Sequence, residues 1–211
     1  MQRVIKGRDI YLIPPVHVYT IIWLHGLGDS AEGFVDLFAS NPLLPNCKVV
    51  LPTAPYQPVT INFGTSCNSW YDFKNLQDEY DRSAEDSVPL VLNYLEEESK
   101  STSNLIIGGF SQGAVMSLYT GLSKYTGNLR AVVALSGYSF PMQVREDKKS
   151  VPVFLFNGGR DPVLPLGRCQ DTYNRNLQGL NVTARTDPRL QHSVSMEEWA
   201  EIKVWLRAQL N

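Results

Sequence analysis

Five short runs of almost uninterrupted apolar residues recur along the chain, at positions 18–24, 48–51, 105–109, 131–135 and 151–156. Runs of this length without polar alternation are typical of strands that are buried on both faces. Such strands occur mainly in parallel sheets that helices cover on each side. The pattern therefore predicts a mostly parallel central sheet.

Segments with helical spacing of their apolar residues lie between and after these runs, at positions 88–95, 115–122, 166–177 and 199–206. Because Pro89 falls inside the first segment, we expect that helix either to begin near Ser87, with the proline in its first turn, or to be kinked at the proline. Ser195 and Glu198 form a capping box, which predicts the start of the last helix. The alternation of strand and helix indicates an α/β fold with helices on both faces of the sheet.

The overall composition narrows the class of protein. A chain of 211 residues is the size of one ordinary domain, so we expect a single domain over residues 1–211. The 19 basic and 21 acidic residues give a net charge of -2, which argues against a nucleic-acid partner. We also expect the protein to use neither a metal nor a cofactor.

The three cysteines and the apolar stretches indicate where the protein works. Cys47, Cys67 and Cys169 are an odd number without CxxC spacing, which is typical of reduced thiols in a cytosolic compartment. Charged residues near the N-terminus interrupt the apolar run that a signal peptide needs. The longest apolar stretch, residues 16–24, is too short to span a membrane. We therefore expect a cytoplasmic protein without an integral membrane segment.

One pentapeptide carries a strong chemical signal. Gly109-Phe110-Ser111-Gln112-Gly113 follows an apolar run and opens a helical segment. This strand-to-helix context is that of a nucleophile elbow, in which a tight turn presents the serine hydroxyl. A Cβ atom at Gly109 or Gly113 would collide with the returning helix. The sequence thus predicts Ser111 as a nucleophile.

A serine hydroxyl needs a histidine to accept its proton. The chain has three histidines, of which His17 and His25 fall in or beside the first apolar run. His192 lies in a loop just before the last helical segment. Where a serine sits on such an elbow, the catalytic groups follow one another in the order serine, acid, histidine. That order selects His192 as the base.

The acid that orients this histidine has three candidates between Ser111 and His192. Asp161 follows the apolar run at 151–156, and the carboxyl ends of parallel strands are where such sheets present their sites. Asp171 falls on a helical segment, and Asp187 lies nearer to His192 in another loop. Asp161 is favoured, and the other two remain alternatives.

Two backbone amides are predicted to stabilise the negative charge that forms on the substrate carbonyl oxygen. One belongs to Gln112, the residue after the nucleophile. The other belongs to the glycine-rich loop at residues 25–29, where the amide of Leu27 is the best candidate. Together they would form an oxyanion hole.

These motifs resemble those of the acyl-protein thioesterases and their lysophospholipase and carboxylesterase relatives, within the α/β-hydrolases. The resemblance spans nearly the whole chain. It rests on the segments at 25–29, 52–60, 69–72, 108–114, 161–165 and 192–193. It implies Ser111, Asp161 and His192 as the catalytic triad, with the Leu27 and Gln112 amides as the oxyanion hole.

The resemblance also implies a reaction and its substrates. Members of this family cleave fatty acyl groups from cysteine thioesters of proteins, and from lysolipids and small esters. The aromatic-rich segment at 52–73 is expected to cover an acyl groove, with Phe63, Trp70 and Tyr71 as candidate substrate contacts. The chain departs from the family at Asn157, where a histidine is usual, and in its shorter segment at 137–150.

The expected partners are therefore S-acylated, palmitoylated proteins or small lipid and ester substrates, with transient contact to a membrane. We expect a monomer or a weak homodimer. Two alternatives stay open: a carboxylesterase or lysophospholipase that acts on small esters or lysolipids, and a binding module that has lost turnover.

Overall fold

The core of the fold is an eight-stranded sheet in the order β1-β2-β4-β3-β7-β8-β9-β10. The structure is a computed structural model and describes residues 1–75 and 77–210. The strands of this sheet are β1 (Gln2–Lys6), β2 (Asp9–Ile13), β3 (Tyr19–Leu24), β4 (Cys47–Leu51), β7 (Leu105–Phe110), β8 (Ala131–Leu135), β9 (Val153–Gly158) and β10 (Val182–Asp187). All pairs from β4 to β10 are parallel, whereas β1–β2 and β2–β4 are antiparallel.

The five apolar runs form β4, β3, β7, β8 and β9, which are neighbours at the centre of this sheet. Their residues are buried almost without exception, as expected for strands that are covered on both faces. This confirms the prediction of a mostly parallel central sheet.

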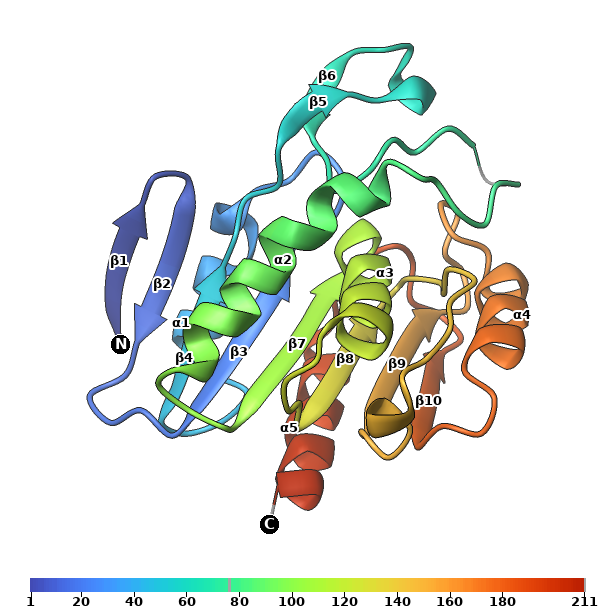
Figure 1. The fold of residues 1–211 in the computed structure, drawn as a ribbon. Coiled ribbons are helices and arrows are strands. Elements are labelled where there is room, and N and C mark those ends of the chain that lie inside the picture. The colour runs from blue at the N-terminus through green and yellow to red at the C-terminus, as the bar shows by residue number, and fades with distance from the viewer. Residues whose placement is uncertain (76, 211) are drawn as a thin grey trace.

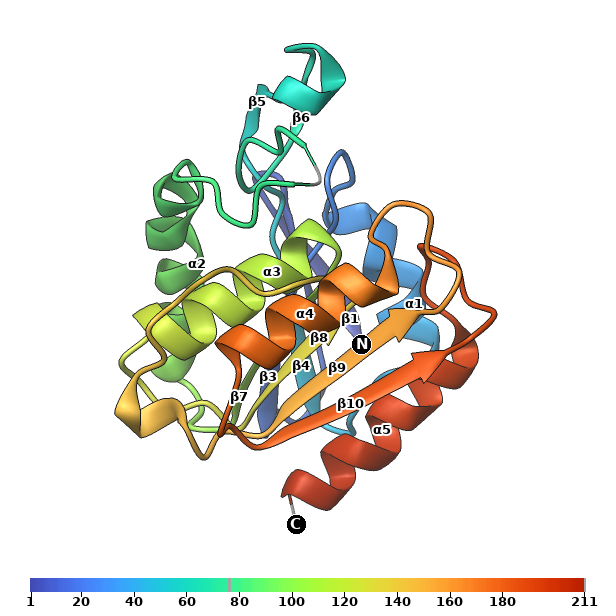
Figure 2. The ribbon, with the colours of Figure 1, turned by 90° about the vertical axis from the view of Figure 1, so that its right-hand side faces the viewer.

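Helices cover both faces, as predicted. They are α1 (Val35–Ser40), α2 (Ala84–Ser99), α3 (Gln112–Tyr119), α4 (Leu166–Asn176) and α5 (Met196–Leu210). Figures 1 and 2 show α2, α3 and α4 on one face and α1 and α5 on the other. Each face has its own buried cluster, with Val91, Val115 and Tyr173 in one and Phe38 and Trp199 in the other.

Several boundaries and elements differ from the predictions. Helix α2 begins at Ala84, three residues before Ser87, so Pro89 lies beyond its first turn. The amide of Ala84 donates to the carbonyl of Asp81, and Glu85 and Asp86 supply negative charge at the helix N-terminus. These contacts extend the helix on its N-terminal side. The elements β1, β2, β10 and α1 were not predicted.

The segment between β4 and α2 forms an arm. It contains the strands β5 (Tyr56–Pro58) and β6 (Ser66–Asn68), which pair antiparallel. Figure 1 shows this arm above the carboxyl ends of the parallel strands. The arm therefore stands beside the edge of the sheet where the predicted site residues lie.

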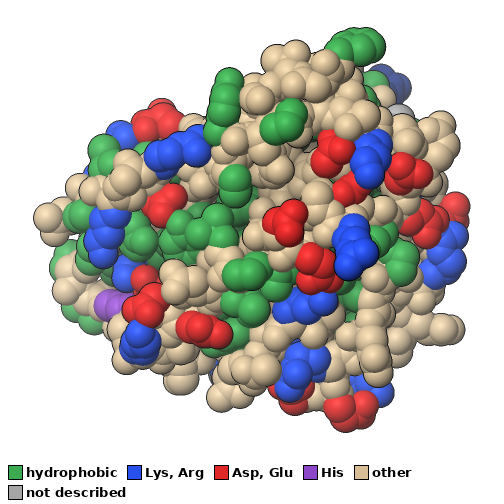
Figure 3. All heavy atoms as spheres, turned by 45° about the horizontal axis from the view of Figure 1, so that its top comes forward, with side chains coloured by type: hydrophobic (Ala, Val, Ile, Leu, Met, Phe, Trp, Pro, Cys, Tyr) green, Lys and Arg blue, Asp and Glu red, His purple; other side chains and the backbone are tan. Residues whose placement is uncertain are grey.

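Surface and hydropathy features agree with the composition. Among the described residues, no helix has the length and apolar character that crossing a bilayer requires. Figure 3 shows acidic and basic side chains interspersed over the face that carries the arm. This mixture of signs gives no broad basic surface on that face.

Candidate active site

Ser111 stands at the turn between β7 and α3. Its backbone has φ 55° and ψ -119°, a conformation that few residues other than glycine adopt. The Ser111 amide donates to the carbonyl of Leu135 on the neighbouring strand β8 at 2.8 Å. Such strain at the tip of a strand-to-helix turn is the geometry of a nucleophile elbow.

The glycines beside the serine are required by space. A Cβ atom on Gly109 would lie 2.5 Å from the carbonyl oxygen of Leu24 and 2.6 Å from the backbone of Gly113. A Cβ atom on Gly113 would lie 2.1 Å from the same Leu24 oxygen. The predicted collision is therefore confirmed, and strand β3 as well as helix α3 causes it.

The structure brings together the three side chains that the sequence selected. His192 Nε2 lies 2.9 Å from Ser111 Oγ, and His192 Nδ1 lies 2.6 Å from Asp161 Oδ2. Since a carboxylate only accepts hydrogen bonds, Nδ1 carries the proton and Nε2 is left to accept from the serine hydroxyl. This order of contacts is the one that activates a serine.

Asp161 is held in place by its second oxygen. Its Oδ1 accepts from the amides of Val163 and Leu164, both at 2.8 Å, and its side chain is fully buried. These two bonds fix the carboxylate before it meets the histidine. The turn after β9 therefore positions the acid without help from the rest of the site.

The alternative residues lie elsewhere. Asp187 Oδ1 accepts from the amide of Arg189, and Asp171 is an exposed residue of α4. His17 Nε2 contacts Thr20 Oγ1 at 2.8 Å. Among these candidates, only Asp161 hydrogen-bonds His192.

His25 has a structural environment. Its Nδ1–H donates to the carbonyl of Gly26 at 2.6 Å, and its Nε2 accepts from the amide of Ala54 at 3.0 Å. Burial lowers the pKa of this imidazole below its ordinary value. A neutral His25 thus ties the loop of Gly26 and Leu27 to the chain after β4.

A cavity of about 260 Å³ opens beside Ser111 and His192. Its wall is mostly apolar and is formed by Gly26, Leu27, Asp29, Tyr71, Phe73, Phe110, Ser111, Gln112, Tyr138, Val163, Leu164 and His192. Small-molecule sites commonly combine such an apolar lining with a few polar groups. The cavity therefore offers an apolar surface next to the serine hydroxyl.

The sequence model of the phospholipase/carboxylesterase family matches residues 15–210. The chain belongs to this family of α/β-hydrolases. It is 35% identical to acyl-protein thioesterase 1 of Yarrowia lipolytica, over 90% of this chain and 91% of that protein. It is 31% identical to acyl-protein thioesterase 1 of Gibberella zeae, over 97% of each chain.

Solved structures of relatives support the same family assignment. The crystal structure of Zea mays acyl-protein thioesterase 2 matches with a TM-score of 0.84 and 30% identity, covering 98% of this chain and all of that one. Arabidopsis thaliana SOBER1 matches with the same TM-score and 28% identity, over 92% of this chain and 99% of that one. The chain is thus a hydrolase of the phospholipase/carboxylesterase family.

The predicted oxyanion-hole residues of this hydrolase both line the cavity. Gln112 is the first residue of α3, where backbone amides have no acceptor within the helix. Over residues 1–75 and 77–210, the amide of Leu27 likewise has no backbone acceptor. Both residues adjoin the space in front of Ser111.

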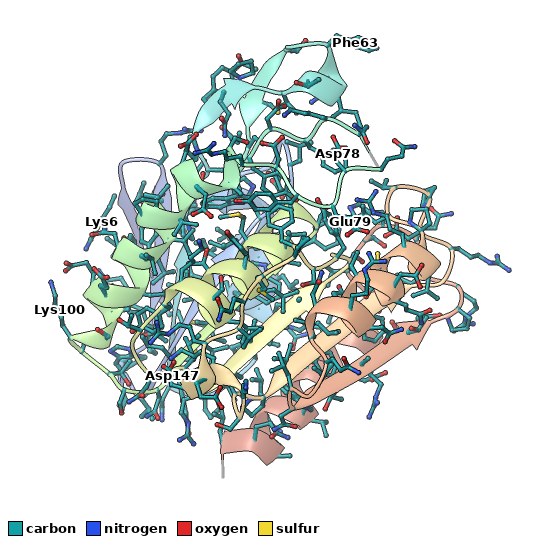
Figure 4. The ribbon with its side chains drawn as sticks, turned by 45° about the vertical axis from the view of Figure 1, so that its right-hand side comes forward. Lys6, Phe63, Asp78, Glu79, Lys100 and Asp147 are labelled. Atoms are coloured by element: carbon teal, nitrogen blue, oxygen red, sulfur yellow. The ribbon has the colours of Figure 1, made fainter. Side chains whose placement is uncertain are left out.

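Of the three predicted substrate contacts, only Tyr71 lines the cavity. Trp70 is fully buried, and its Nε1 donates to the carbonyl of His25 at 2.8 Å. Tyr71 is part of the cavity wall, whereas Trp70 is not. Phe63 is fully exposed at the end of the arm and points away from the sheet (Figure 4). Trp70 and Phe63 are therefore not part of the wall of this cavity, and Tyr71 is the one of the three candidate substrate contacts that is.

The side chain of Gln112 has a role that the sequence did not indicate. It is buried, and its Nε2 donates to the carbonyl of Tyr71 at 2.8 Å while its Oε1 accepts from the amide of Trp70 at 2.8 Å. Gln112 therefore joins the base of the arm to the elbow. No spacing in the sequence relates residues 42 positions apart, so only the structure reveals this link.

Asn157 is a position at which we expected this chain to depart from the family. It is buried in β9, and its Nδ2 donates to the carbonyl of Gly137 at 3.0 Å. This bond connects the end of β9 to the loop after β8. Asn157 is not part of the cavity wall.

Proposed function

We propose that this hydrolase cleaves acyl thioesters of S-acylated proteins, and related esters, through an acyl-enzyme. The observation that carries the proposal is the continuous contact from Ser111 through His192 to the buried Asp161. The proposal draws further support from the relatives that are named acyl-protein thioesterases.

In the first half of the reaction, Ser111 Oγ attacks the carbonyl carbon while His192 Nε2 accepts the hydroxyl proton. The thiolate then leaves and takes that proton from His192, which releases a free thiol and leaves the acyl group on Ser111. Asp161 holds the imidazole in the tautomer that makes this transfer possible.

In the second half, His192 accepts a proton from water, and the resulting hydroxide attacks the acyl-serine. The carboxylic acid departs and Ser111 recovers its proton. In both halves the carbonyl oxygen gains negative charge, and the amides of Leu27 and Gln112 adjoin the space where it forms. Loss of one such donor typically slows turnover by about 10² to 10³.

The state of the cysteines supports our proposal of a cytoplasmic location. Cys47, Cys67 and Cys169 are all free thiols. Burial raises the pKa of Cys47 and of Cys169 to about 12, so neither is poised as a thiolate. Their burial favours packing roles.

This function is tested with a fluorophosphonate probe and with two octanoyl substrates, a thioester and an oxyester. The probe should label the protein, and the label should disappear in Ser111→Ala. The wild-type protein should hydrolyse an octanoyl thioester of a cysteine peptide, and Ser111→Ala should lose this activity by at least about 10³.

Ser117→Ala is the matched control. Ser117 is buried on the same helix, and its hydroxyl donates to the carbonyl of Gly113 rather than to a group of the site. Labelling that persists in Ser111→Ala would contradict the assigned nucleophile. Hydrolysis of oxyesters with no hydrolysis of thioesters would favour the small-ester alternative.

A further inference from the structure

The cavity beside Ser111 is bounded at one side by two tyrosines. The hydroxyls of Tyr71 and Tyr138 lie 3.1 Å apart and hydrogen-bond each other. Both side chains are almost fully buried, with 1% and 2% exposure. Pairing the hydroxyls lets two polar groups close an apolar cavity without the penalty of an unsatisfied donor or acceptor.

Phe140 packs behind this pair. Its ring centroid lies 5.0 Å from that of Tyr71 and 5.7 Å from that of Tyr138. The ring is 1% exposed, so both tyrosines rest against a fully buried support. We call Tyr71, Tyr138 and Phe140 the aromatic wall.

A second, larger hollow lies close to the aromatic wall. Its volume is about 950 Å³, and its lining includes Tyr119, Lys124 and the segment at 141–147. The ring of Tyr119, which lines this hollow, lies 5.5 Å from that of Phe140. Phe140 thus packs against both tyrosines of the small cavity and against one residue that lines the hollow.

Further contacts make the wall rigid. The Arg168 guanidinium lies over the ring of Tyr138, 4.9 Å from its centroid. Burial raises the pKa of Tyr138 to about 12, which keeps its hydroxyl protonated and able to bond Tyr71. Aromatic packing, a hydrogen bond and a stacked cation hold the wall, so we expect it to keep its position when substrate binds.

From this geometry we infer that the aromatic wall limits the acyl group to a medium chain, of about eight carbons. The cavity of about 260 Å³ also includes the space in front of Ser111 and His192, so it has room for at most about eight methylene-sized groups of roughly 30 Å³ each. A longer chain must leave the cavity past the half-exposed Val163. This inference rests on the proposed function and specifies its substrate class.

The first test is the acyl-chain profile of the wild-type protein. Acetyl, butanoyl, octanoyl, dodecanoyl and palmitoyl thioesters of one cysteine peptide are compared below the concentrations at which they form micelles. Each methylene that enters the cavity should raise kcat/KM about fourfold. We expect the rise to stop near octanoyl and palmitoyl to be at least tenfold poorer.

The second test changes the wall. Phe140→Ala removes the support behind Tyr71 and Tyr138, so the two rings can move toward the hollow and lengthen the cavity. The ratio of dodecanoyl to octanoyl kcat/KM should rise at least tenfold. Phe154→Ala is the matched control, because it removes an equally buried ring from the core on the other face of the sheet. In Phe154→Ala, the ratio of dodecanoyl to octanoyl kcat/KM should stay within about twofold of wild type.

A third variant covers the case in which Phe140→Ala does not fold. Leu164→Phe adds volume at another residue of the cavity wall, and the chain-length optimum should then move below octanoyl. The inference that the aromatic wall limits chain length would be overturned by a wild-type kcat/KM that rises steadily to palmitoyl. It would also be overturned if the ratio of dodecanoyl to octanoyl kcat/KM were unchanged in both Phe140→Ala and Leu164→Phe. If no thioester or ester is hydrolysed and Ser111 is not labelled, the proposed function itself fails.

Discussion

Asp161 illustrates how one residue can be prepared for chemistry by its own loop. One carboxylate oxygen accepts from the amides of Val163 and Leu164, and the other faces His192. The residue is thus oriented before any substrate arrives. This preorganisation is what an acid in a serine hydrolase must provide.

Replacing this carboxylate by an amide gives a sharp prediction. Asp161→Asn keeps the shape of the side chain but lets the histidine adopt the wrong tautomer, so kcat should fall by about 10³ to 10⁴. Steady-state kinetics on an octanoyl thioester measures the effect. The control is Asp187→Asn, which changes the alternative acid, and its kcat should stay within about threefold of wild type. Equal losses in both variants would contradict the assignment of the acid.

His25 makes stability depend on pH. Burial lowers its pKa in the folded state, so the native imidazole stays neutral while the unfolded one takes up a proton below about pH 6.5. The stability that neutral His25 provides is therefore present above pH 6.5 and is lost as the pH falls below it. The slope from this group is at most about 1.4 kcal/mol per pH unit.

Urea unfolding between pH 7.5 and pH 5 tests this contribution. His25→Gln should be less stable than wild type at pH 7.5, and its stability should fall less on acidification. His17→Gln is the control, because His17 is only partly buried and bonds Thr20. A wild-type slope that His25→Gln leaves unchanged would show that another group is responsible.

At the scale of elements, the turn from β7 into α3 depends on close approach to β3. Gly113→Ala would place a Cβ atom 2.1 Å from the Leu24 carbonyl oxygen, so it should destabilise the protein by about 2–3 kcal/mol or prevent folding. Gly167→Ala, in the first turn of α4, meets no atom within 4 Å and should be neutral or stabilising by up to about 1 kcal/mol. Thermal unfolding compares the two variants. Equal effects would mean that helix propensity, not the approach of β3, sets the requirement.

The elements that could be predicted are those with a clear pattern in the local sequence. The central strands are continuous apolar runs, and the capping box forms as expected, with Glu198 N donating to Ser195 Oγ at 3.0 Å. Strand β10 was missed because it is an edge strand with exposed residues such as Arg185. Its pairing with β9 comes from tertiary context, which overrides local pattern.

The residues of the candidate site also divide into those that local sequence indicates and those that tertiary contacts determine. Ser111, Asp161 and His192 could be selected because chain order and flanking turns restrict them. The cavity wall could not, because the directions of Tyr71 and Trp70 depend on a register set by Gln112, 41 and 42 positions away. Phe140 carried no motif at all. Long-range packing decides which aromatic residues line the cavity.

At the scale of the whole molecule, the parallel sheet brings distant loops to one edge. Ser111 and His192 are 81 positions apart and Asp161 and His192 are 31 apart, yet their side chains are in contact. Each loop follows the carboxyl end of a strand or precedes a helix that the two buried clusters hold. The fold therefore fixes the three side chains that we propose carry out the reaction.

The most direct test of this account is to observe the acyl-enzyme. The protein is mixed with an octanoyl thioester, quenched in acid within milliseconds to seconds, and analysed by intact and peptide mass spectrometry. The account predicts a transient octanoyl adduct on the peptide that contains Ser111, which is absent in Ser111→Ala. Full turnover with no adduct at any time, or an adduct on another residue, would contradict it.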